Sequence, residues 1–167
     1  MYKDNRITVV IPCLNEEEGI QRVLAALPAF VDEVIVVDNA STDRTEEVAR
    51  RMGATVIKEL ARGYGRAYKK GFQSAAGDII VTLDGDHSYP VDALSYLIEA
   101  LLQSRVDFLS ASRFPLLTEE AMHWKNNIGN RILSLTMSVL FWRWVSDSQS
   151  GMWVFRRRAL DLMKLES

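Results

Sequence analysis

Short apolar runs rich in β-branched residues alternate along this 167-residue chain with segments in which apolar residues recur at helical spacing. A continuous apolar run of four or five residues is typical of a strand buried on both faces, as in a parallel sheet. We therefore predict an α/β fold: a three-layer sandwich around a mainly parallel central sheet, formed by a single domain over residues 1–167. The expected strands are residues 7–11, 34–37, 55–57, 79–83, 108–111 and 152–155.

Turn and capping residues predict where these elements begin and end. Pro12 is expected to end the first strand, and Asn15 is expected to cap the helix that follows. Asp43 and Glu46 form a capping-box pattern, and the helix after them is expected to end at Gly53. Further helices are predicted up to residue 75, over 91–103 and 121–144, and at the C-terminus.

Polar residues follow three of the expected strands. Pro12–Asn15 follows the first strand, Asp38 and Asn39 follow the second, and Asp84-Gly85-Asp86 follows the fourth. The carboxyl ends of parallel strands meet at one edge of the sheet, so these segments should converge there. Two carboxylates at i and i+2 repel each other without a cation. The pair therefore predicts a site for Mg²⁺ or Mn²⁺ that also holds phosphate oxygens.

Composition excludes several classes of protein. Twenty Lys and Arg against 22 Asp and Glu give a formal net charge of −2, whereas a general nucleic-acid binder would have a basic excess. Cys13 is the single cysteine, so an internal disulfide is excluded and a reducing compartment is expected. The N-terminus lacks the layout of a signal peptide. The longest mostly apolar stretch, residues 132–142, is shorter than the ~20 residues that span a bilayer. We expect a cytoplasmic protein, soluble or peripheral at the inner face of a membrane.

Five segments together resemble a known family. Three of them are residues 10–17 (VIPCLNEE), 36–43 (VVDNASTD) and 84–86 (DGD). They are similar to motifs of the inverting family 2 glycosyltransferases with the GT-A fold. Two more, residues 62–67 (RGYGRA) and 146–151 (SDSQSG), resemble polyprenyl-phosphate sugar transferases of the dolichol-phosphate mannose or glucose synthase type. The resemblance extends from about residue 7 to residue 160.

The resemblance implies a nucleotide-sugar donor at the ends of the first two strands. Asp38 would bind ribose hydroxyls or a base N–H, and Pro12, Asn15 and Glu16 would line the same pocket. The alternatives are that Asn15 and Glu16 only begin a helix and that Asp38 only forms a turn.

Gly63 and Gly65 would let the backbone approach the donor, with Arg62 and Arg66 bringing positive charge to its phosphates. A loop packed over the sheet, with solvated arginines, is the alternative for this segment.

Asp84 and Asp86 would hold the metal, which would bridge the donor diphosphate and neutralise the leaving group. Asp86 is expected to contact the metal most directly and is therefore a predicted catalytic residue. His87 follows at once, and is either a further ligand or, as we expect, exposed.

Four residues are candidates for the acceptor side. Arg113, Arg131 and Ser134 would bind an acceptor phosphate, with Arg131 also counted as catalytic. Asp147 lies where relatives that glycosylate hydroxyls have their catalytic base. A phosphate acceptor is already largely ionised at neutral pH because its second pKa is about 6, so Asp147 would then orient it. Trp153 stands where many relatives have arginine, which leaves the acceptor contacts open.

The apolar segment from Ile132 to Trp144 either packs in a core or faces a lipid tail and the membrane surface. Relatives of this kind usually continue well beyond the point at which this chain stops, so the alternatives for its C-terminus are a truncated domain, a fragment or a naturally minimal form.

Three functions are consistent with these residues. The first is transfer of a hexose from a GDP-mannose or UDP-glucose type of donor to a polyprenyl phosphate, with inversion and with Mg²⁺ or Mn²⁺. The second is transfer to a sugar hydroxyl with Asp147 as base. The third is a nucleotide-sugar-binding module without activity. The sequence distinguishes neither the nucleotide, nor the sugar, nor the oligomeric state.

Overall fold

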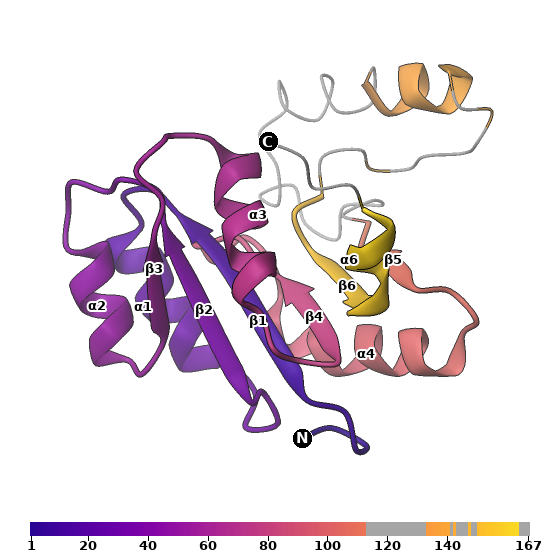
Figure 1. Cartoon of the computed structure of the whole chain (residues 1–167), viewed down its shortest axis with the longest axis horizontal. Helices are drawn as coiled ribbons and strands as arrows, with labels where there is room; N and C mark the ends of the chain where they lie inside the picture. Colours follow the sequence, from indigo (N-terminus) through magenta and orange to yellow (C-terminus); the bar gives the residue numbers. More distant parts are fainter. Residues whose placement is uncertain (113–132, 141, 143–146, 148–149, 164–167) are drawn as a thin grey trace. The chain divides into compact units, whose positions relative to one another are not determined.

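The computed structural model describes residues 1–112, 133–140, 142, 147 and 150–163. The chain divides into two compact units, residues 1–109 with 152–167 and residues 110–151. The first unit contains the sheet and nearly all of the described helices (Figure 1).

Six strands form one sheet in the order β3-β2-β1-β4-β6-β5. β1 pairs in parallel with β2 and β4, and β2 pairs in parallel with β3, whereas β6 is antiparallel to β4. The predicted α/β fold with a mainly parallel sheet is therefore confirmed. The strands are β1 Ile7–Cys13, β2 Glu33–Asp38, β3 Thr55–Lys58, β4 Ile79–Thr82, β5 Phe108–Ser110 and β6 Trp153–Arg156.

The helices follow the predicted pattern closely. They are α1 Glu17–Ala26, α2 Thr45–Arg51, α3 Tyr64–Ser74, the 3₁₀ helix η1 Val91–Ala93, α4 Leu94–Gln103 and α6 Arg158–Leu162. Residues 133–140 are helical. The rest of the helix predicted over 121–144 lies outside the described residues, except Trp142, which is described and is not helical. None of the helices in the described ranges has the length and hydropathy that crossing a bilayer requires.

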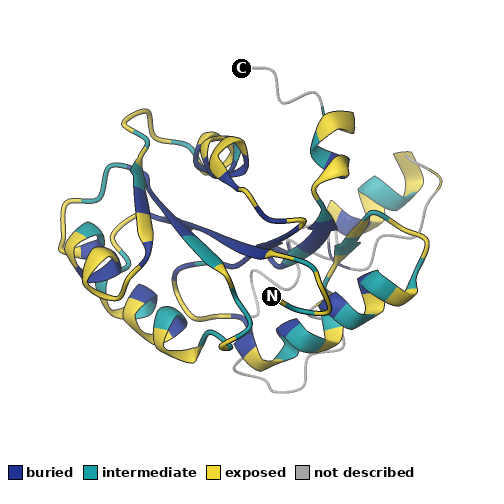
Figure 2. Cartoon of the chain, turned by 60° about the horizontal axis from the view of Figure 1, so that its bottom comes forward, coloured by how far each residue is buried: buried dark blue, intermediate teal, exposed yellow. Residues whose placement is uncertain are grey.

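Helices pack on both faces of the sheet, between which the central strands β1 and β4 and most of β2 are buried (Figure 2). On one face, Val10 and Val37 share a core cluster with Phe72 of α3 and Ala159 of α6. α3 comes very close to the sheet at Gly71, where an added Cβ would lie 2.4 Å from Val10 Cγ1. Because side chains alternate along a strand, the neighbours of Val10 point to the opposite face. β1 is buried on both faces, as its continuous apolar run predicts.

The prediction that Pro12 ends the first strand is wrong, because β1 continues to Cys13. The Val10 carbonyl accepts from Leu83 N at 3.2 Å, on the β4 side, and the Cys13 carbonyl accepts from Asn39 N at 2.8 Å, on the β2 side. Successive residues of β1 therefore direct their backbone N–H and C=O groups alternately toward β4 and toward β2, and the backbone of Pro12 faces β4, as that of Val10 does. β4 ends at Thr82, opposite Val10, so the missing N–H of Pro12 leaves no strand bond unmade.

The capping box predicted at Asp43 and Glu46 is also wrong, although the end of α2 is confirmed. Glu46 does not reach back but pairs with Arg50 and Lys58, at 3.2 and 2.6 Å. Gly53 follows α2 with a φ of +87°, the left-handed conformation that favours glycine after a helix.

Candidate active site

Three parallel strands end side by side, as predicted from their polar ends. β2, β1 and β4 are neighbours in the sheet, and Asp38 and Asn39 are buried where β2 ends. Cys13 is buried at the end of β1 and lies against the loop after β4, since a Cβ on Gly85 would be 2.7 Å from its sulfur. Pro12–Glu16, Asp38 and Asp84-Gly85-Asp86 therefore belong to one edge of the sheet.

Glycines allow the loop after β4 to contact the first turn of α1. A Cβ on Gly19 would lie 2.3 Å from the Gly85 carbonyl oxygen and 2.9 Å from Asp86 Cα. A Cβ on Gly85 would be 2.7 Å from Cys13 Sγ and 3.4 Å from Glu16 Cβ. A side chain at Gly19 would therefore collide with the backbone of the loop, and one at Gly85 would collide with the Cys13 sulfur. The sequence analysis missed Gly19, whose only signal was a glycine in the first turn of an amphipathic helix.

The two aspartates of the loop have different surroundings. Asp84 is half-buried, and its Oδ1 accepts a hydrogen bond of 2.5 Å from the Tyr64 hydroxyl. Asp86 is exposed, and its Oδ1 accepts from Ser88 N at 2.9 Å. His87 is exposed, as expected, with a φ of +62°.

Negative charge accumulates at this edge. Burial, and then the charges of Asp86, Asp43 and Asp84, raise the pKa of Glu16. Burial first, and then the neighbouring carboxylates beginning with Glu16, raise the pKa of the Cys13 thiol. Cys13 is consequently a neutral, apolar packing group and no nucleophile.

The carboxylates fit a hard divalent cation that has additional ligands. Carboxylate oxygens are the donors that Mg²⁺ and Mn²⁺ prefer, and the repulsion felt by Glu16 is what a cation would relieve. In the described part of the chain, no three His, Cys, Asp or Glu side chains form a ready-made metal cage. A cation at Asp84 and Asp86 would therefore take its remaining ligands from water and from a bound phosphate, the usual arrangement for Mg²⁺.

The start of α1 is held by the loop after β2 and not by Asn15 as its N-cap, so that prediction is wrong. The residue at the N-cap position is Glu16, and Asn15 has a φ of +60°. Asn15 Oδ1 accepts instead from Thr42 N at 2.7 Å. The Glu16 and Glu17 amides donate to the Thr45 hydroxyl and to Asp43 Oδ2, at 2.8 and 3.1 Å.

Asp43 stabilises both helix starts. It accepts from the Thr45 amide and hydroxyl as well as from the Glu17 amide. Burial alone would raise the pKa of Asp43, but these hydrogen bonds together hold it below its usual value.

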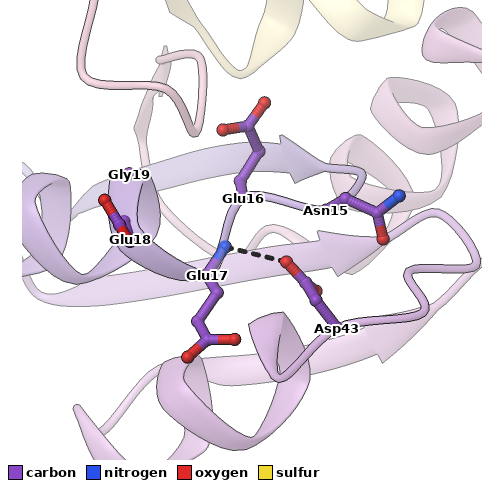
Figure 3. A pocket seen from close by; sticks show the side chains of 6 residues that line it. All are labelled: Asn15, Glu16, Glu17, Glu18, Gly19 and Asp43. Atoms are coloured by element: carbon purple, nitrogen blue, oxygen red, sulfur yellow. Dashed lines mark hydrogen bonds between the residues drawn. The ribbon is translucent and has the colours of Figure 1, made fainter.

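A shallow hollow opens beside this junction. It is lined by Asn15, Glu16, Glu17, Glu18, Gly19 and Asp43, and Figure 3 shows Glu16 pointing away from Glu17 and Asp43. Because four of these residues are acidic, the hollow repels phosphate, so only a neutral or cationic group suits it.

The buried amide of Asn39 holds the loop between β3 and α3. Its Nδ2 donates to the carbonyls of Glu59 and Ala61, both at 3.0 Å, and its Oδ1 accepts from Gly63 N at 2.7 Å. Next to it, Asp38 Oδ1 accepts from Ser41 N at 3.1 Å, as a turn residue would. The sequence analysis placed Asn39 at the strand end but did not identify this role.

The two glycines of residues 62–67 have different environments. Gly63 precedes α3 with a φ of +152° and so needs to be glycine, whereas Gly65 lies inside α3 with open space around it. Arg62 and Arg66 are exposed. The geometry of this loop does not test the predicted role of Arg62 and Arg66 in donor binding, which stays a prediction.

Of the acceptor candidates, Arg113 and Arg131 are outside the described residues. Ser134 and Asp147 are buried and belong to the second unit. Trp153 begins β6, and its backbone N–H donates to Thr82 Oγ1 at 2.9 Å. Its ring centroid lies 5.2 Å from that of Tyr68, so the partly buried Trp153 packs against the core.

Comparison with known proteins identifies a family. The model of "Glycosyl transferase family 2" matches residues 8–163. A low-salt glycan biosynthesis hexosyltransferase, Agl6, of Haloferax volcanii is 34% identical over 168 residues, which cover 96% of this chain and 41% of that protein. A dolichyl-phosphate hexose transferase of the same organism is 35% identical over 162 residues, covering 95% of this chain and 70% of that protein.

A solved structure has the same fold. Glucosyl-3-phosphoglycerate synthase from Mycobacterium tuberculosis, in complex with Mn²⁺, UDP and glucosyl-3-phosphoglycerate, superimposes with a TM-score of 0.71 at 28% identity. The match covers 94% of this chain and 58% of that one. The chain thus spans about half the length of the first relatives it matches.

Proposed function

Because this chain belongs to glycosyl transferase family 2, we propose that it transfers a hexose from a nucleotide sugar to a polyprenyl phosphate with inversion at the anomeric carbon. The observation that carries the proposal is the contact between Asp84-Gly85-Asp86 and the first turn of α1, next to Asp38. This contact places two candidate metal ligands beside the strand ends where α/β sheets bind nucleotides.

The donor site is proposed at this edge. Asp38 would accept hydrogen bonds from the nucleoside, with Pro12, Asn15 and Glu16 beside it. A divalent cation on Asp84 and Asp86 would bridge the diphosphate and stabilise its charge as it leaves. A solved relative contains Mn²⁺ and UDP, which supports this class of donor and cofactor.

The donor would be contacted from the side of α3 by the backbone at Gly63 and Gly65 and by the exposed Arg62 and Arg66. The left-handed conformation of Gly63 supports a role for this loop, which Asn39 ties to the end of β2 next to Asp38.

The acceptor is proposed from the relatives and from chemistry. One relative carries the name dolichyl-phosphate hexose transferase. An ionised phosphate oxygen would form the new bond to the anomeric carbon while the bond to the nucleoside diphosphate breaks. Arg113, Arg131 and Ser134 would hold that phosphate, and Asp147 would orient it. Such an acceptor implies work at the cytoplasmic membrane surface.

Transfer to a hydroxyl is the second candidate, because the solved relative contains glucosyl-3-phosphoglycerate. A hydroxyl is a weak nucleophile and needs a general base, for which Asp147 is the candidate. This candidate predicts that Asp147→Asn abolishes transfer, whereas transfer to a phosphate should be reduced much less.

Calorimetric titration with GDP-mannose and UDP-glucose, with Mn²⁺ or with EDTA, tests the donor site. We expect one of the two to bind only with Mn²⁺ and binding to be lost in Asp86→Ala. The matched control is Asp92→Ala, which removes an exposed carboxylate in η1. If the folded protein binds neither donor, or if Asp86→Ala binds like wild type, the donor-site assignment is wrong. Measuring sugar transfer to polyprenyl phosphate and to phosphoglycerate then decides between the two proposed acceptors.

A further inference from the structure

Tyr64 is a polar aromatic residue of the site that none of the roles above uses. It is the first residue of α3, 20 positions before Asp84 in sequence, and its hydroxyl donates to Asp84 Oδ1 at 2.5 Å. We propose that Tyr64 is a positioning residue for the cation site: its hydrogen bond to Oδ1 fixes the orientation of the Asp84 carboxylate, one of the two carboxylates that would hold the metal. This inference rests on the proposed function, since it assumes a cation at Asp84 and Asp86.

The ring of Tyr64 is held by aromatic packing. It meets Tyr68 edge to face, with centroids 4.8 Å apart and an interplanar angle of 86°, and the two hydroxyls are 3.1 Å apart. Tyr68 is buried, and it packs against Phe72 and Trp153 at 5.4 and 5.2 Å. Tyr64 is itself 53% exposed, but its ring packs against the buried Tyr68, which restricts the positions that its hydroxyl can take.

The backbone before Tyr64 is fixed as well. Gly63 N donates to the buried Asn39 side chain at 2.7 Å, and Asn39 follows Asp38 at the end of β2. Tyr64 thus connects the strand end proposed for the nucleoside to the carboxylate proposed for the metal.

The phenol can act only as a donor to Asp84. An ionised carboxylate has no proton to donate, so the Tyr64 hydroxyl is the donor in this hydrogen bond and Asp84 Oδ1 is the acceptor. Hydrogen bonds of this kind, from a side chain to a metal-binding carboxylate, orient the ligand, and their loss typically costs about 10–100-fold in metal affinity.

Tyr64→Phe tests the inference, because it removes the hydroxyl and keeps the ring. Tyr2→Phe is the matched control: it removes another tyrosine–carboxylate bond, from Tyr2 to Glu99 at 2.8 Å, on a different part of the first unit. Binding of UDP, and separately of GDP, is measured by calorimetry across a Mn²⁺ series and in EDTA. Melting temperatures are recorded in parallel.

We expect Tyr64→Phe to raise the Mn²⁺ concentration needed for half-maximal nucleotide binding by about 10–100-fold. Binding in EDTA and the melting temperature should stay close to wild type, and Tyr2→Phe should leave the Mn²⁺ requirement unchanged. An unchanged Mn²⁺ requirement in Tyr64→Phe would overturn the inference, as would an equal loss of affinity with and without metal.

The same titration separates this inference from the proposed function. If wild type needs Mn²⁺ and Asp86 but Tyr64→Phe behaves as wild type, only the role of Tyr64 is wrong. If wild type shows no Mn²⁺-dependent nucleotide binding, the donor site and the role of Tyr64 are both wrong.

Discussion

Replacing Gly19 by alanine should damage the site more than it damages the fold. The new Cβ would lie 2.3 Å from the Gly85 carbonyl oxygen, and real Cβ atoms essentially never come closer than 3.0 Å to such an atom. The loop after β4 must therefore retreat by about 0.7 Å, and Asp86 moves with it because its Cα is only 2.9 Å from the same Cβ.

Two opposing terms determine the stability of Gly19→Ala. Alanine is better than glycine inside a helix by about 1 kcal/mol. Overpacking against the rigid backbone of the loop costs about 1–3 kcal/mol. We expect a net loss of about 1 kcal/mol in the free energy of unfolding, which corresponds to a fall of about 2–4 °C in melting temperature for a domain of this size.

The effect on the site should be larger, because displacement of a site group by about 1 Å can cost about 100-fold in activity. We expect Mn²⁺-dependent nucleotide binding of Gly19→Ala to weaken about 10-fold or more, measured by calorimetry at a temperature at which the protein is fully folded. Gly65→Ala is the control for stability: the same change in α3 meets nothing within 4 Å, so the free energy of unfolding should rise by up to about 1 kcal/mol.

Wild-type nucleotide binding by Gly19→Ala, together with a rise in stability like that of Gly65→Ala, would refute this reasoning. It would mean that the loop after β4 moves freely and that its contact with α1 does not position Asp86.

Two further changes test the loops that hold the site. Asn39→Ala removes the buried side chain that bonds Glu59, Ala61 and Gly63, and we expect a loss of about 1–3 kcal/mol in the free energy of unfolding, measured by chemical denaturation; Asn5→Ala, at a half-buried site, should cost less. Asp43→Ala removes the acceptor of the Glu17 and Thr45 amides and should cost about 1 kcal/mol at neutral pH. Because the folded pKa of Asp43 is lowered, its contribution is present above the unfolded value of 3.8 and is lost as the pH falls through the folded value. Wild type and Asp43→Ala should then converge in stability at strongly acidic pH, and a constant difference would contradict this.

Local patterns in the sequence predicted the layout of the fold. The apolar runs of β1, β2 and β4 correspond to strands because a strand buried on both faces carries apolar residues at successive positions, and Gly53 marks the end of α2 because its backbone is left-handed. The errors concern Pro12, Asn15 and the pair Asp43–Glu46. A partner distant in sequence decides the outcome for two of them: the early end of β4 for Pro12, and the contact between the loops after β1 and β2 for Asn15. Glu46 pairs instead with Arg50 and Lys58.

The site divides in the same way. The sequence alone determined that Asp38, Asp84 and Asp86 share one edge of the sheet, because parallel strands that alternate with helices all end on the same side. Only the tertiary structure revealed that Gly19 and Gly85 allow the loop after β4 to reach α1, that Asn39 holds the loop before α3, and that Tyr64 bonds Asp84. The physical reason is that close packing and hydrogen bonds between separate loops depend on distances between atoms, which periodicity and local spacing in a sequence do not encode.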